Sequence, residues 1–110
     1  MTDVEFRDRV VIVTGASTGI GRATAEAFAR AGALVAIFAR SAEKLNAIAK
    51  SFGEKMLAVS GDVSDANAIN RLFAETESRF GDCDVLVNNA GMIDPKRMID
   101  ATPEAWDRMF

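Results

Sequence analysis

The sequence predicts an α/β fold in which helices cover both faces of a parallel β-sheet, a doubly wound arrangement. Two observations support this prediction. Four apolar runs of strand length recur along the chain, and each run is continuous rather than alternating with polar residues, which is typical of strands that are covered on both faces. The segments between the runs carry apolar residues at a helical period. The four predicted strands are residues 9–15, 33–39, 55–61 and 84–90.

Three helices are predicted between these strands, and each closes at a glycine. The first ends before Gly32, a candidate C-cap, and the second lies between the candidate N-cap Ser41 and a stop at Gly53. The third extends from Ser64 to Gly81. The apolar stripes are Ile20, Ala23, Ala27, Phe28 and Ala31 in the first helix, Leu45, Ile48 and Phe52 in the second, and Ile69, Leu72, Phe73, Thr76 and Phe80 in the third. Strands and helices that alternate in this way form βαβ units with right-handed crossovers.

The composition is that of an ordinary soluble protein and argues against several classes of partner. The net charge is −3 and no cluster of Lys and Arg interrupts it, so the basic field of a nucleic-acid-binding protein is missing. No apolar run approaches the ~18 residues of a membrane span, and the N-terminal residues lack the apolar core of a signal peptide. The expected location is therefore the cytoplasm. Cys83 is the only cysteine, so an intramolecular disulfide is excluded and a small buried side chain is its expected role.

The segment VTGASTGIG follows the first apolar run and opens the first predicted helix. A strand that feeds a glycine turn and then a helix brings unpaired backbone N–H groups and the positive helix end to one point, which suits a phosphate. Gly15 allows the tight exit from the strand, Gly19 lets the backbone approach a pyrophosphate, and Gly21 lets the helix pack close to the sheet. The predicted contacts in this loop are Gly15, Ser17, Thr18, Gly19, Ile20 and Gly21.

A nucleoside triphosphatase is disfavoured by the end of the same loop. A P-loop ends in Gly-Lys followed by Ser or Thr, whereas this segment continues as GIGRAT. The missing lysine removes the group that such proteins place on the terminal phosphates.

Three motifs occur in order, each at the end of a predicted strand: TGASTGIG at 14–21, DV at 62–63 and NNAG at 88–91. With these motifs the chain resembles the short-chain dehydrogenase/reductase family. The resemblance implies a Rossmann-type domain that binds a nicotinamide dinucleotide across the carboxyl ends of its strands. It also implies an oxidoreductase that passes hydride between the nicotinamide and a small-molecule carbonyl or alcohol substrate, and a homo-oligomer, often a tetramer.

The resemblance assigns further cofactor contacts to the second and third motifs. The Asp62 carboxylate would accept from the adenine amino group, and the backbone of Val63 would meet the adenine ring. The alternative for Asp62 is a turn-capping role before Ser64. Asn88 would hold the end of its strand. The residues expected beneath the cofactor ribose are Asn89, Ala90 and Gly91.

The cofactor is expected to be NADP(H), with NAD(H) as the alternative. An NAD site commonly has an acid near the end of the second strand, about 20 residues past the glycines, but here Ala39 is followed by Arg40 and Ser41. A carboxylate repels a 2′-phosphate, whereas a guanidinium binds it through charge-assisted hydrogen bonds. Thr18 departs from the pattern, because NADP-preferring relatives often carry a basic residue there. A surface role for Arg40 is the other interpretation.

No catalytic residue and no metal site are assigned. Hydride transfer to a carbonyl needs a proton donor near the developing alkoxide, and the chain contains no histidine and no tyrosine. The family's donor is a tyrosine assisted by lysine, serine and asparagine, all expected beyond Phe110. The charged residues Asp94, Lys96 and Asp100 follow NNAG, but loop charges at a helix approach are more often solvated.

Residues 1–110 are therefore expected to be the N-terminal, dinucleotide-binding part of a single Rossmann-type domain, truncated within a helix. A capping residue, a proline and an acid coincide at Thr102, Pro103 and Glu104, and the helix that they open runs into Phe110 without a stop signal. Two alternatives stay open. One is a free-standing dinucleotide-binding module without catalysis. The other is an interaction domain whose unfinished sheet edge completes the sheet of another chain.

Overall fold

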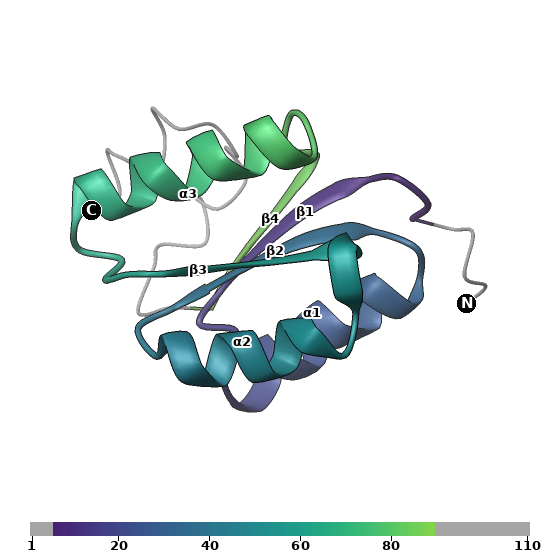
Figure 1. Ribbon diagram of the computed structural model, residues 1–110, viewed down its shortest axis with the longest axis horizontal. Helices are drawn as coiled ribbons and strands as arrows, with labels where there is room; N and C mark the ends of the chain where they lie inside the picture. The colour runs from purple at the N-terminus through teal and green to yellow at the C-terminus, as the bar shows by residue number, and fades with distance from the viewer. Residues whose placement is uncertain (1–5, 90–110) are drawn as a thin grey trace.

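The computed structural model describes residues 6–89 of the chain. These residues form one four-stranded parallel sheet with the strand order β3-β2-β1-β4, with helices on both faces (Figure 1). The predicted doubly wound α/β fold, incomplete at about four strands, is confirmed. The elements are β1 (Val10–Thr14), α1 (Gly19–Arg30), β2 (Leu34–Ala39), α2 (Ala42–Lys50), the 3₁₀ turn η1 (Gly53–Lys55), β3 (Met56–Ser60), α3 (Ala66–Arg79) and β4 (Val85–Asn88).

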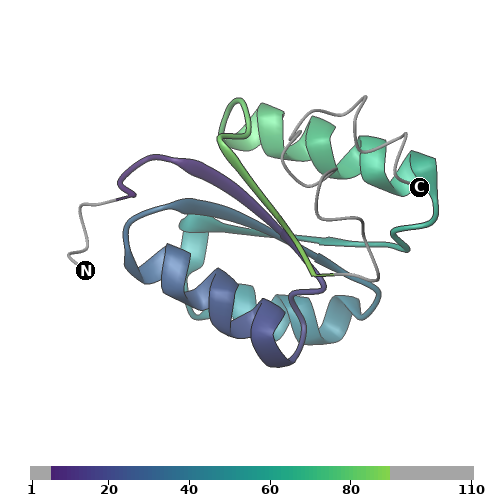
Figure 2. The ribbon, with the colours of Figure 1, turned by 180° about the vertical axis from the view of Figure 1, so that it is seen from behind.

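The helices divide between the two faces of the sheet. α1 and α2 lie side by side on one face, whereas α3 covers the other, and the same division is seen from behind in Figure 2. In β1 alternate side chains serve the two layers, so that Val11 and Val13 join the core with α2 while Ile12 joins the core with α3. All five residues of β1 are buried. This double coverage is the reason why the strand is apolar from Val10 to Val13.

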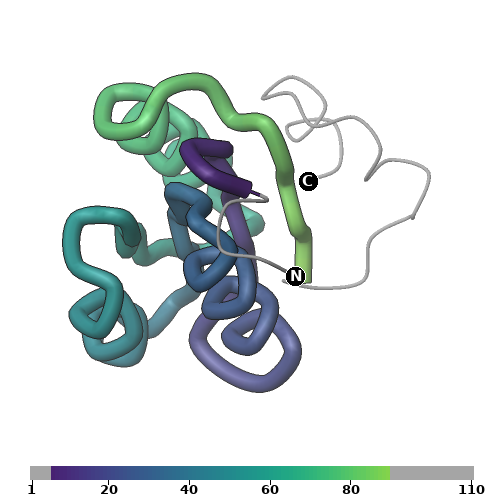
Figure 3. The backbone as a smooth tube through the Cα atoms, turned by 90° about the vertical axis from the view of Figure 1, so that its right-hand side faces the viewer, coloured from purple at the N-terminus to yellow at the C-terminus, as the bar shows by residue number. Residues whose placement is uncertain are grey.

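The sheet has β1 and β2 at its centre and β4 at one edge. β1 pairs with β2 from Val10↔Leu34 to Thr14↔Phe38, and with β4 from Val11↔Val85 to Thr14↔Asn88. In the side view of Figure 3, β4 runs along the outside of the sheet, away from β3. Because all pairings are parallel, the carboxyl ends of the four strands meet at the same rim of the sheet.

The apolar stripe predicted for α1 is partly wrong. Ile20, Ala23 and Ala27 are exposed, with 79% of Ile20 accessible, and the buried residues of the helix are Gly21 and Ala25. The helix has alanine on several sides, so a small apolar residue gives little information about the direction of burial. The close approach of Gly21 to the preceding loop sets the rotation of the helix instead.

The helix ends also differ from the prediction by one to a few residues, and the C-cap of α1 is Ala31 rather than Gly32. α3 begins at Ala66, because Asp65 is its N-cap and accepts from the Asn67 amide at 3.0 Å; the start predicted at Ser64 is wrong. α2 ends at Lys50, before the predicted stop, and Gly53 instead opens η1 with φ +63°. The N-cap predicted at Ser41 is confirmed, since Ser41 Oγ accepts from the Lys44 amide at 3.3 Å.

Candidate functional site

The carboxyl rim of the sheet gathers most of the predicted site residues. The turns that follow β2 and β3 are joined there, because the Gly61 amide donates to the Ala39 carbonyl at 2.9 Å. The loop after β1 is tied to β2 in the same way, by the Ala16 amide and the Phe38 carbonyl at 3.3 Å. Motifs that lie far apart in the sequence therefore share one edge of the sheet. The predicted contacts that follow the strand ends here are Gly15, Ser17, Thr18, Gly19, Arg40, Ser41, Asp62, Val63 and Asn89.

Two glycines of the loop have left-handed backbone. Gly15 has φ +62° directly after β1, and Gly19 has φ +59° where α1 begins. Side chains of L-residues disfavour this left-handed region, which glycine enters freely. A Cβ placed on Gly19 would meet no atom within 4 Å. Gly19 is thus required for its backbone conformation, and its outer side is open to an approaching group.

Gly21 is required for space rather than for φ. A Cβ built on Gly21 would lie 2.0 Å from the Gly15 carbonyl oxygen, 2.8 Å from the Gly15 carbonyl carbon and 3.3 Å from Ala16 Cα. The sequence predicted close packing of the helix on the sheet; the observed close contact is with the loop between them. The first turn of α1 consequently lies directly against the exit of β1.

The amino end of α1 differs from the amino ends of the other two helices. Ser41 caps α2 and Asp65 caps α3, each with a side-chain oxygen. Thr18 occupies the N-cap position of α1 with extended backbone but makes no side-chain cap hydrogen bond, and the first turn contains no acidic residue. The first amides of a helix have no intrahelical partner and carry the positive end of the helix dipole. The end of α1 therefore offers donors to an anion, beside the exposed Thr18 and Ile20 and the half-buried Ser17.

Arg40 and Asp62 form an ion pair at the same rim. Arg40 Nη2 lies 3.2 Å from Asp62 Oδ2, and the Arg40 side chain is 81% exposed. The other carboxylate oxygen, Oδ1, accepts from the Ser64 amide at 2.9 Å and from the Ser64 hydroxyl at 2.8 Å. The amide and hydroxyl of Ser64, followed by the charge of Arg40, hold the pKa of Asp62 below its usual value. The turn-capping role considered for Asp62 is thus present in the structure.

A pocket of about 190 Å³ adjoins this pair, lined by Gly15, Ala39, Arg40, Gly61 and Val63. Gly61 is a lining residue that the sequence analysis did not select. A Cβ on Gly61 would lie 2.8 Å from Ala68 Cβ and 3.0 Å from the Phe38 ring, so only glycine fits between β3 and the start of α3. The sequence feature that could have identified Gly61 is its position directly before the DV motif.

A sequence model of the short chain dehydrogenase family matches residues 9–110. The chain belongs to the short-chain dehydrogenase family. It is 41% identical over 102 residues to the sorbitol dehydrogenase of Cereibacter sphaeroides, in a match that covers 93% of this chain and 40% of that protein.

Two solved structures resemble the fold. The L-sorbose reductase of Gluconobacter frateurii, in complex with NADPH and L-sorbose, has a TM-score of 0.74 and 36% identity, with 96% of this chain and 41% of that chain covered. The glucose/ribitol dehydrogenase of Brucella melitensis has a TM-score of 0.78 and 35% identity, with coverages of 99% and 46%. The chain thus spans less than half the length of these relatives.

A second residue that the sequence analysis missed, Thr14, ties the rim of this short-chain dehydrogenase chain together. The buried Thr14 hydroxyl donates to Asn88 Oδ1 at 2.8 Å and accepts from the Asn89 amide at 3.0 Å. The expectation that Asn88 holds the end of its strand is confirmed by this contact. The sequence feature that could have identified Thr14 is a hydroxyl residue at the end of an otherwise apolar strand.

Some of the residues considered in the sequence analysis lie outside the described residues. These are Ala90, Gly91, Asp94, Lys96, Asp100 and the helix expected from Thr102.

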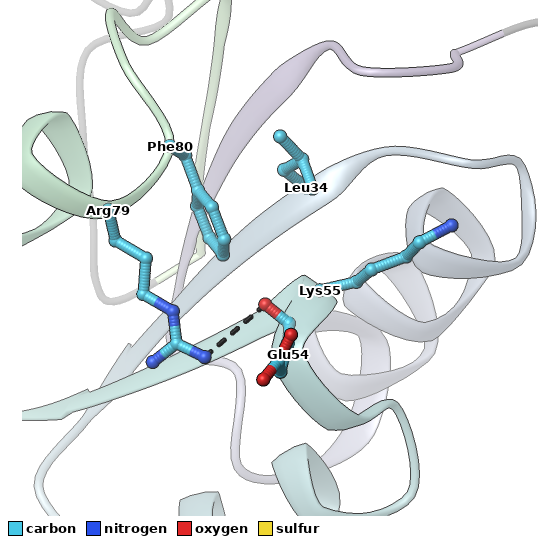
Figure 4. Close-up of a pocket in the computed structure, with 5 residues that line it drawn as sticks. All are labelled: Leu34, Glu54, Lys55, Arg79 and Phe80. Carbon is cyan, nitrogen blue, oxygen red and sulfur yellow. Dashed lines mark hydrogen bonds between the residues drawn. The ribbon is translucent and has the colours of Figure 1, made fainter.

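Another pocket, of about 520 Å³, lies at the opposite rim of the sheet, where β2 and β3 begin (Figure 4). Its lining residues are Leu34, Glu54, Lys55, Arg79 and Phe80. Arg79 Nη2 donates to the Glu54 carbonyl at 3.3 Å, which ties the end of α3 to η1. None of the predicted cofactor contacts lines this pocket.

Among residues 6–89, no helix is long and apolar enough to span a membrane.

Proposed function

We propose that this chain supplies the dinucleotide site of an NADP(H)-dependent short-chain dehydrogenase/reductase. The complete protein would transfer hydride between the nicotinamide and a carbonyl or alcohol substrate, and residues 1–110 would be the N-terminal part of its single Rossmann-type domain. The observation that carries this proposal is the amino end of α1, which lacks a side-chain cap and opens at the carboxyl rim of the sheet.

The described residues support a dinucleotide in two places. The amides from Gly15 to Gly21 suit the diphosphate, because Gly19 is open on its outer side and Thr18 leaves the helix amides available. The pocket beside Val63 suits the adenine ring, and the Asp62 carboxylate would accept from the adenine amino group. Asn89, together with Ala90 and Gly91, would lie beneath the ribose. When bound, the nicotinamide would supply or accept the hydride.

The preference for NADP(H) is supported by the residues that follow β2. Arg40 stands where an NAD site commonly has an acid, and its exposed guanidinium lines the rim pocket. Ser41 at the N-cap of α2 is the neighbouring candidate for the 2′-phosphate. The relative from Gluconobacter frateurii that was solved with NADPH has the same fold.

The proposal also covers the location, the oligomeric state and the partners of the complete protein. We place it in the cytoplasm as a homo-oligomer, with a small-molecule carbonyl or alcohol as substrate and without nucleic-acid or membrane partners. The proton donor would be a tyrosine in a Tyr-x-x-x-Lys pair beyond residue 110. A reading frame without such a pair would favour a dinucleotide-binding module without catalysis.

Replacement of Arg40 tests the cofactor assignment. Arg40→Ala in the full-length protein removes a charge-assisted hydrogen bond of about 1.5–3 kcal/mol, so the Kd for NADPH should rise roughly ten- to a hundredfold, while the Kd for NADH changes little. Isothermal titration calorimetry with both dinucleotides measures this. Arg30→Ala, in the last turn of α1, is the matched control and should leave both affinities unchanged. An unaltered NADPH affinity in Arg40→Ala would remove Arg40 from the site.

A further inference from the structure

The Arg40–Asp62 ion pair joins two residues that the proposed function assigns to different parts of the cofactor. The pair bridges the turns after β2 and β3, which are already linked by the hydrogen bond from Gly61 to Ala39. A 2′-phosphate on Arg40 therefore has to compete with a carboxylate that contacts the same guanidinium at 3.2 Å.

The two partners are held to different degrees. Asp62 is anchored through Oδ1 by two hydrogen bonds from Ser64, which are independent of Arg40. The Arg40 side chain is 81% exposed, against 42% for Asp62. The negative charge thus stays fixed at the rim when the guanidinium turns towards another anion. The lowered pKa of Asp62 keeps this charge present at neutral pH.

We propose that Asp62 is a specificity-determining residue that moderates the preference for NADP(H) over NAD(H). Its fixed carboxylate competes for Arg40 and repels a phosphate bound to the guanidinium, whereas a ribose 2′-hydroxyl is indifferent to both effects. The inference rests on the proposed function, since it assumes that Arg40 faces the ribose 2′ position. As a consequence, the preference for NADPH over NADH is smaller than Arg40 would produce without Asp62.

The sign of the effect separates this proposal from a positioning role. If Asp62 mainly oriented Arg40 for the phosphate, its removal would weaken NADPH selectively. The exposure of Arg40 argues against such a role, because exposed ion pairs constrain their side chains weakly. In the proposed function Asp62 also meets the adenine, but the adenine is common to both cofactors. The ratio of the two dissociation constants, Kd(NADH)/Kd(NADPH), therefore isolates the effect at the 2′ position.

The test is Asp62→Asn in the full-length protein, titrated with NADPH and NADH by calorimetry. Asparagine keeps an Oδ1 acceptor for Ser64 and removes the charge; Asp62→Ser is a second neutral variant if the first does not fold. Loss of an exposed ion pair and of the repulsion should raise Kd(NADH)/Kd(NADPH) about three- to tenfold. Ser64→Ala removes one hydrogen bond to Oδ1 but keeps both charges, so this control should leave the ratio unchanged.

A double-mutant cycle that combines Asp62→Asn with Arg40→Ala shows whether the effect of Asp62 acts through Arg40. In the Arg40→Ala background the charge of Asp62 has no guanidinium to occupy, so Asp62→Asn should raise the ratio by less than in the wild type. An unchanged or lowered ratio in Asp62→Asn would overturn the inference while leaving the proposed function in place. If Arg40→Ala itself left NADPH binding intact, Arg40 would be removed from the site and the inference would fail with its premise, whereas the assignment of the glycine loop to the diphosphate would stand.

Discussion

Gly21→Ala adds one methyl group where the structure leaves no room. The new Cβ would start 2.0 Å from the Gly15 carbonyl oxygen and 2.8 Å from the Gly15 carbonyl carbon. Both atoms belong to the backbone of the loop, so no flexible side chain can turn away. The contact must open by at least 1 Å to reach 3.0 Å, below which real Cβ contacts essentially never lie. The first turn of α1 therefore has to move away from the loop.

This displacement should lower both stability and cofactor affinity. Overpacking of a tight contact typically costs about 1–3 kcal/mol in the free energy of unfolding. The amides that we propose to face the diphosphate belong to the same turn, so their shift should remove at least one hydrogen bond to a charged group. Such a loss, about 1.5–3 kcal/mol, corresponds to a rise in Kd of roughly ten- to a hundredfold for NADPH and NADH alike.

Two other glycines provide matched controls. Gly53→Ala places a methyl group at φ +63° with nothing within 4 Å, far from the loop in the sequence. Its cost should be the strain of the left-handed backbone alone, about 1–2 kcal/mol. Gly19→Ala has nearly the same φ, +59°, and equally open space. It should match Gly53→Ala in stability but, unlike Gly53→Ala, should weaken dinucleotide binding, because its methyl group occupies the approach to the loop.

The assay is urea unfolding of the full-length variants followed by circular dichroism, together with calorimetric titration of both dinucleotides. Wild-type stability in Gly21→Ala would refute the packing argument. Wild-type affinity in both Gly19→Ala and Gly21→Ala would refute the assignment of the loop to the diphosphate, whatever the stabilities show.

Two further predictions concern β4 and the segment before it. Thr14→Val keeps the shape of the buried side chain but removes its hydrogen bonds to Asn88 and Asn89, so it should lower the free energy of unfolding by about 1–3 kcal/mol. The control Thr24→Val loses only a hydrogen bond to Ile20 within α1 and should change the free energy of unfolding by about 0.5 kcal/mol or less. Equal effects of the two substitutions would contradict the proposed link between β1 and β4. Burial raises the pKa of the Cys83 thiol above its usual value, so the stability that this thiol contributes is complete below the pKa of the unfolded chain and declines as the pH rises through the folded pKa. Alkylation at pH 8, followed by mass spectrometry of the peptide that contains Cys83, should be slower in the native protein than in urea, and equal rates would show that the thiol is exposed.

The sequence by itself determined the fold class and gathered the candidate site at the ends of the predicted strands. Continuous apolar runs specify strands buried on both faces, and the glycines after the first run specify a turn and a helix start within a few residues. These signals are local, so they can be read without knowing which strands pair. The N-cap at Ser41 is predictable for the same reason, because its oxygen serves an amide three residues away.

Only the tertiary structure decided which distant groups meet. Arg40 and Asp62 are 22 residues apart, and Thr14 and Asn88 are 74 apart; their contacts depend on the parallel register of β2 with β3 and of β1 with β4. The rotation of α1 was equally hidden, because alanines on several sides of the helix leave its apolar stripe ambiguous. The contact of Gly21 with Gly15 resolves it. Pairing between strands and packing between layers depend on the whole chain at once, and no short segment encodes them.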